Sequence, residues 1–88
     1  MDGIPINQYA DIAGISASSL RRYVKPYQEA LKVLKQQGYV FNYKVVLFLS
    51  YVLSYDVRKF YPNEDEQKLI VEQKKIVDKV NEILHRQY

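Results

Sequence analysis

The expected fold depends on one stretch of the chain, Gly14-Ile15-Ser16-Ala17-Ser18-Ser19-Leu20-Arg21-Arg22-Tyr23. Gly14 follows a helical pattern and suits the left-handed conformation that ends a helix. Ser16 is a good N-cap residue, so a second helix is expected from about Ala17 to Lys25. A helix, a short turn containing glycine and a second helix form the pattern of a helix-turn-helix.

The segments around this stretch also read as helices. The first helix is expected to begin near Asn7, a good N-cap residue. The segment Pro26 to Gln37 is compatible with a short helix, with Pro26 at its first position and Gly38 past its end. A looser, turn-like path is the alternative for this segment.

A short β-segment and an apolar helix are expected next. Tyr39, Val40 and Phe41 favour extended backbone. Asn42 is placed to cap an apolar helix from Tyr43 to about Phe60.

The last helix has the clearest periodicity. Asn63 is expected to cap it, and the acidic residues Glu64, Asp65 and Glu66 complement its dipole. Its apolar residues recur at heptad spacing and suggest a dimerisation surface. This surface comprises Leu69, Ile70, Ile76, Val77, Val80, Ile83 and Leu84. A protomer this small cannot easily bury so apolar a helix, so we expect a homodimer; the alternative is that the helix folds back on the head.

Composition and charge narrow the possible functions. The chain has 88 residues, no cysteine and a formal net charge of +3. Residues 1–61 carry eight basic and four acidic residues, a net +4, whereas residues 62–88 carry five basic and six acidic residues, a net −1. A basic head favours a polyanionic partner. No signal peptide is visible, and the apolar stretch Val45 to Leu53 is too short to span a membrane, so a soluble, cytoplasmic protein is expected.

Catalytic chemistry is not expected. His85 is the only histidine, and no nucleophilic triad or metal site can be assembled around it. The chain has no glycine-rich phosphate loop. We therefore expect no catalytic residues, metal, cofactor or small-molecule effector.

The second helix has the chemistry to read DNA. Small side chains at Ala17, Ser18 and Ser19 allow close approach to a groove. The guanidinium groups of Arg21 and Arg22 suit guanine edges or phosphates.

This pattern resembles the MerR-type winged helix-turn-helix family, over roughly Ile4 to Leu53. The matching residues are Gly14-Ile15-Ser16, Leu20-Arg21-Arg22-Tyr23 and Gly38-Tyr39-Val40-Phe41, followed by Asn42 as the next cap. The resemblance implies that Arg21 is the recognition-helix arginine, that Tyr23 is the second family tyrosine, and that Tyr39 and Phe41 shape a wing.

The chain departs from the family pattern at several positions. Ser18 stands where a basic residue is usual, Arg22 replaces the first tyrosine and Val40 replaces the wing arginine. Lys35 and Lys44 are then the bases nearest the wing. We expect no effector domain beyond the last helix, which would make the chain similar to the minimal plasmid and phage members of the family.

These observations predict a mainly α-helical protein: a winged helix-turn-helix domain with a small β wing (residues 1–61) and a C-terminal amphipathic dimerisation helix (residues 62–88). The expected function is sequence-specific binding of double-stranded DNA as a dimer, in transcriptional regulation, as a repressor, or in plasmid or chromosome partition. The expected DNA contacts are Ser16, Ala17, Ser18, Ser19, Arg21, Arg22, Tyr23, Lys25, Lys35, Tyr39 and Lys44. The alternatives are a helical protein-interaction adaptor and an excisionase-like factor that bends DNA.

Overall fold

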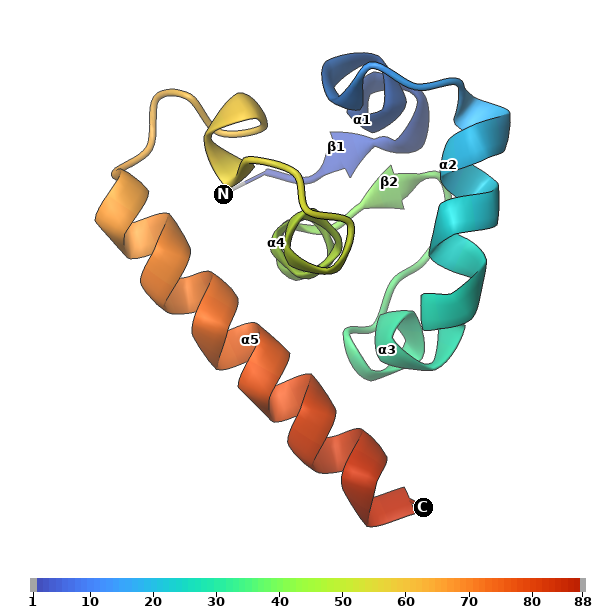
Figure 1. Cartoon of the computed structure of the whole chain (residues 1–88), viewed down its shortest axis with the longest axis vertical. Coiled ribbons are helices and arrows are strands. Elements are labelled where there is room, and N and C mark those ends of the chain that lie inside the picture. The colour runs from blue at the N-terminus through green and yellow to red at the C-terminus, as the bar shows by residue number, and fades with distance from the viewer. Residues whose placement is uncertain (1, 88) are drawn as a thin grey trace.

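The computed structural model describes residues 2–87 and is mainly helical, with a small two-stranded sheet and a long C-terminal helix. In chain order its elements are β1 (Ile4–Pro5), α1 (Ile6–Ala13), α2 (Ala17–Val24), the 3-10 turn η1 (Lys25–Tyr27), α3 (Gln28–Val33), β2 (Val40–Phe41), α4 (Tyr43–Val52), the 3-10 turn η2 (Val57–Lys59) and α5 (Glu66–Gln87). Figure 1 shows α4 in the middle, with α1, α2 and α3 around one side of it and α5 crossing the other.

The turn between α1 and α2 forms as the sequence predicts. Gly14 adopts a left-handed conformation with φ of 76° at the end of α1. The hydroxyl of Ser16 accepts a hydrogen bond from the Ser19 N–H at 3.1 Å and so caps α2. The prediction that Asn7 caps α1 is wrong, because α1 already begins at Ile6. The Ile6 N–H donates to the carbonyl of Tyr39 at 2.9 Å, so the sheet satisfies this end of the helix.

The segment between α2 and β2 combines both alternatives that the sequence left open. Pro26 lies in the 3-10 turn η1, and α3 begins only at Gln28. The helix ends before the left-handed residue Lys35, which has φ of 59°, and so stops earlier than the sequence indicated. The Asn42 side chain accounts for this early end, because its amide nitrogen donates to the carbonyl of Leu34 at 3.0 Å.

The apolar helix α4 is capped as predicted but is shorter. Asn42 caps it by accepting a hydrogen bond from the Val45 N–H at 3.0 Å. The helix ends at Val52 rather than near Phe60, because Ser54 turns the backbone left-handed with φ of 61°. The chain then doubles back through η2, which allows Phe60 to enter the core.

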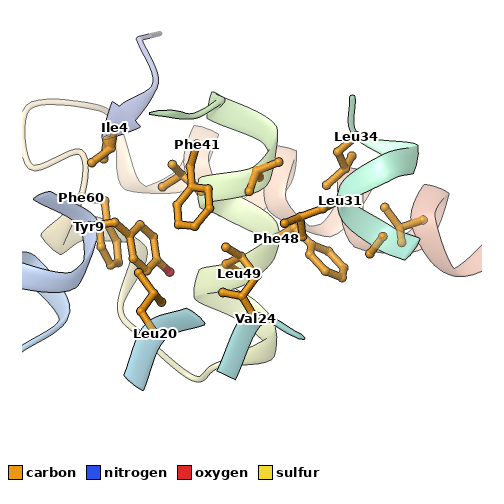
Figure 2. Packing of buried hydrophobic residues seen from close by; sticks show 14 of the residues in the cluster. Ile4, Tyr9, Leu20, Val24, Leu31, Leu34, Phe41, Phe48, Leu49 and Phe60 are labelled. Atoms are coloured by element: carbon orange, nitrogen blue, oxygen red, sulfur yellow. The ribbon is translucent and has the colours of Figure 1, made fainter. Parts of the chain in front are cut away.

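An aromatic cluster holds the N-terminal part of the fold against α4. The ring of Tyr9 stacks on Phe60, with centroids 4.3 Å apart, and meets the edge of Phe41 at 5.3 Å. Its hydroxyl lies 3.4 Å from the hydroxyl of the buried Ser50. Burial raises the pKa of Tyr9 above its ordinary range. Figure 2 shows this cluster beside Leu20, which comes from α2.

The C-terminal helix packs against the rest of the same chain. It begins at Glu66, and the carboxylate of Asp65, not Asn63, accepts a hydrogen bond from the Gln67 N–H at 2.8 Å. The side chains of Leu69, Val77 and Val80 are buried in the core. The structure therefore has the folded-back arrangement, which was the alternative to a helix that presents its apolar side to a partner.

The apolar character of α4 explains why α5 folds back. Six consecutive residues of α4, from Val45 to Ser50, are buried, so this helix needs neighbours on every side. The first segments of the chain cover one side and α5 covers the other, where Gln73 also donates to the carbonyl of Leu47 at 2.8 Å. Of the predicted pairing residues, Ile76, Ile83 and Leu84 are half-buried, and Ile70 is 46% exposed. No helix between residues 2 and 87 is both long and apolar enough to cross a membrane.

Candidate nucleic-acid interface

The helix α2 presents one apolar and one polar side. Leu20 and Val24 are buried against the core and fix its orientation. Residues in a helix are about 100° apart, so Ser18 and Arg22 lie opposite the buried side and Arg21 lies on its flank; all three are exposed. The helix contains no acidic residue. Its outer surface is therefore positively charged and lined by short side chains at its first turn.

Hydrogen bonds at the start of α2 distinguish the two arginines. The hydroxyl of Ser16 donates to that of Ser19 at 3.0 Å, and a guanidinium nitrogen of Arg22 donates to the Ser19 hydroxyl at 3.4 Å. Arg22 is therefore held back toward the helix start. Arg21 has no hydrogen-bond or ion-pair partner among the side chains that the structure describes, so its guanidinium group is available to a ligand.

Arg21 lies beside Tyr39, a residue of the turn before β2. The two side chains line a hollow of about 170 Å³ together with Pro5, Ile6 and Asn7. Tyr39 is 81% exposed, while its backbone carbonyl is fixed by the bond from Ile6. Asn7 was missed as a candidate contact because its residue type suggested a helix cap.

The side chain of Gln36 also holds the turn that carries Tyr39. The side-chain nitrogen of Gln36 donates to the carbonyl of Val40 at 2.7 Å, and its oxygen accepts from the Asn42 N–H at 3.1 Å. Strand β2 pairs with the N-terminal strand, matching Ile4 with Phe41. The exposed residues of this region are Lys35, Gln37, Gly38, Tyr39 and Val40.

The remaining predicted contacts on α2 lie toward other parts of the surface. Tyr23 is 47% exposed and lies on the flank away from Arg21. Burial, and then the neighbouring Tyr23, raises the pKa of Tyr55. Ala17 and Ser19 are half-buried, whereas Lys25 is exposed just after the helix.

Lys35 and Lys44 do not adjoin Arg21 but line a groove on the other side of the turn. This groove has a volume of about 360 Å³ and lies between α3, the start of α4 and α5. Lys75 and Lys79 of α5 line it as well. Lys75 and Lys79 were not predicted as contacts, because the sequence does not show which segment α5 packs against. There they only flank the apolar heptad positions.

Acidic side chains gather at the end of the molecule away from α2. The carboxylate of Asp56 pairs with Arg58 at 2.8 Å, and Arg58 also reaches Glu66 at 3.5 Å. The hydrogen bond from Arg58 lowers the pKa of Asp56. Figure 1 shows this end, around η2 and the start of α5, across the molecule from α2. The acidic side chains at this end are thus paired with Arg58, whereas the charged residues of α2, Arg21 and Arg22, are both positive.

Other kinds of site are not evident in residues 2–87, which contain no group of three histidine or acidic side chains placed to hold a metal ion. Comparison of the chain with family models, with curated proteins and with solved structures finds no match. A function must therefore be inferred from the residues and their arrangement.

Proposed function

We propose that the protein binds double-stranded DNA in a sequence-specific manner and that α2 enters the major groove. The observation that carries this proposal is the exposed, acid-free side of α2, on which Arg21 has no described partner and lies next to Tyr39. A helix docked through Leu20 and Val24 presents such a side at a fixed angle, as recognition helices do. The MerR-like pattern of residues around the turn supports the same function.

The proposed roles follow from the positions of the side chains. Arg21 reads a guanine through a bidentate contact, and Ser18 contacts a neighbouring base edge. Arg22, held by Ser19, and Lys25 contact phosphates. The exposed hydroxyl of Tyr39 contacts the backbone or the adjacent groove from the turn.

We also propose that two copies of the chain bind two half-sites of one duplex. These copies would not pair with each other through the whole apolar side of α5. Leu69, Val77 and Val80 are buried within one chain, so a second copy is not needed to cover them. Compact copies that bind neighbouring half-sites would act as a repressor where the site overlaps a promoter, or as a partition factor on a plasmid.

The test is selection of random-sequence duplexes by the full chain, repeated at low and near-physiological salt. We expect an enriched motif that survives the higher salt, and half-site spacing in that motif would reveal paired binding. Arg21→Ala should lose the motif, whereas Arg58→Ala, the same change at the acidic end, should keep it. Absence of any enriched motif with the wild-type chain would overturn the proposal and favour the protein-interaction adaptor instead.

A further inference from the structure

The lysine groove, defined by Lys35, Lys44, Lys75 and Lys79, concentrates charge from three separate segments. It contains four lysines against one glutamate, Glu72, a net charge of +3. This equals the formal net charge of the whole chain. A local excess of this size raises the concentration of polyanions at the groove.

Little within the chain neutralises these lysines. Glu72 carries a single negative charge against four lysines, and its carboxylate also accepts a hydrogen bond from the Tyr43 hydroxyl at 2.6 Å. None of the four ammonium groups has an ion-pair partner among the side chains described in residues 2–86. Lys75 and Lys79 are also one helical turn apart, a spacing at which like charges repel and destabilise a helix. Four lysine ammonium groups without ion-pair partners among the described side chains are suited to bind an anionic partner from outside the chain.

The groove adjoins the α2 surface across one short turn. Arg21 lines a hollow with Gln36 and Gly38, and Lys35, at the start of the same turn, lines the groove. The two surfaces therefore border the same short turn, and a duplex that contacts both has to span only that turn.

We infer that α5 is a second DNA-binding element, whose Lys75 and Lys79 act with Lys35 and Lys44 to hold the phosphate backbone beside the bases that α2 reads. This inference rests on the proposed function. The chemistry fits a backbone rather than a base, because lysine ammonium groups act as flexible point charges and lack the planar fork that reads guanine.

The salt dependence of binding tests this role. Removal of one lysine–phosphate interaction should reduce the slope of log K against log salt by about 0.9, so K75Q/K79Q should lower it by roughly 2. Affinity should fall for specific and random duplexes alike, and the selected motif should not change. K75R/K79R keeps the charge and should keep the slope.

Lys74 provides a matched control. It is the neighbour of Lys75, is exposed, and lies on the other flank of α5, outside the groove. K74Q should leave the slope and the affinity unchanged. Thermal unfolding without DNA should show that K75Q/K79Q is folded, since the change removes a repulsive pair.

The outcomes separate this inference from the proposed function. An unchanged slope in K75Q/K79Q, with the selected motif still bound, would overturn the role of α5 and leave recognition by α2 intact. An equal loss of salt slope per lysine in K74Q and in K75Q/K79Q would also overturn it, because the effect would then come from net charge alone. A wild-type chain that binds no DNA would overturn both.

Discussion

The hydroxyl of Tyr43 donates a hydrogen bond to Oε2 of Glu72 at 2.6 Å and joins the first turn of α4 to α5. Because the acceptor is charged, this bond is stronger than one between neutral groups. Burial, and then this bond, raises the pKa of Tyr43. Tyr43→Phe should lower the free energy of unfolding by about 1–2 kcal/mol, measured by urea denaturation. Tyr51→Phe, at an exposed position of the same helix, is the control; an equal loss in both variants would contradict the role of this hydrogen bond.

The two adjacent apolar residues Leu69 and Ile70 should respond differently to truncation. Leu69 is fully buried, while Ile70 is 46% exposed. Leu69→Ala should lower the free energy of unfolding by about 2–5 kcal/mol, whereas Ile70→Ala should change it by about 0.5 kcal/mol or less. Both values should be independent of protein concentration. A large effect of Ile70→Ala that diminishes on dilution would instead indicate that α5 pairs with a second copy.

Local capping chemistry could be predicted from the sequence because it involves residues only a few positions apart. Gly14, Ser16 and Asn42 act as expected. The exposed side of α2 could be predicted for the same reason, since helical spacing alone separates Leu20 from Arg21. The prediction that Asn7 caps α1 was wrong because a distant segment, next to β2, accepts the hydrogen bond of the N–H group at the start of this helix.

Tertiary partners could not be predicted in the same way. The heptads of α5 suit burial against another copy or against α4 equally well, and the sequence does not show that Val45 to Ser50 of α4 need a neighbour on every side. The same applies to the groove, since Lys35 and Lys75 are distant in sequence and meet only because α5 folds back. The end of α4 near Ser54 was missed because a left-handed serine has no strong sequence signal.

Arg21 and Arg22 should have distinct effects on DNA binding. Arg21 has no described partner and faces Tyr39, so Arg21→Ala should cost about 1–3 kcal/mol of binding free energy and relax specificity at one position. Arg22 is held by Ser19. Arg22→Ala should weaken binding to all sequences and reduce the salt slope by about 1. Titration of specific and scrambled duplexes distinguishes these outcomes; identical profiles for the two variants would be inconsistent with the assigned roles.

Alkaline pH should destabilise the fold through Tyr61. Its hydroxyl donates to the carbonyl of Asp2 at 2.8 Å, and burial, followed by the charge of Asp2, raises its pKa to about 12. An unfolded tyrosine ionises near pH 10, so the unfolded chain loses this proton first and stability falls as pH rises from about 10 to 12. Below about pH 9 the contribution is constant. Thermal unfolding across this range should show a smaller alkaline decline for Tyr61→Phe; a decline as steep as that of the wild type would exclude the contribution.

Lys35 should show opposite effects on stability and binding. Its left-handed backbone, with φ of 59°, is unfavourable for a residue with a Cβ atom. Lys35→Gly removes this strain but increases the entropy of the unfolded chain, so the net gain in unfolding free energy should be about 0.5 kcal/mol. The same change removes one charge from the lysine groove and should weaken DNA binding. Lys35→Asn is the second variant, because asparagine tolerates the same backbone conformation. Weaker DNA binding by both variants, without loss of thermal stability, would show that Lys35 contributes its charge to binding. Unchanged DNA binding would place Lys35 outside the interface.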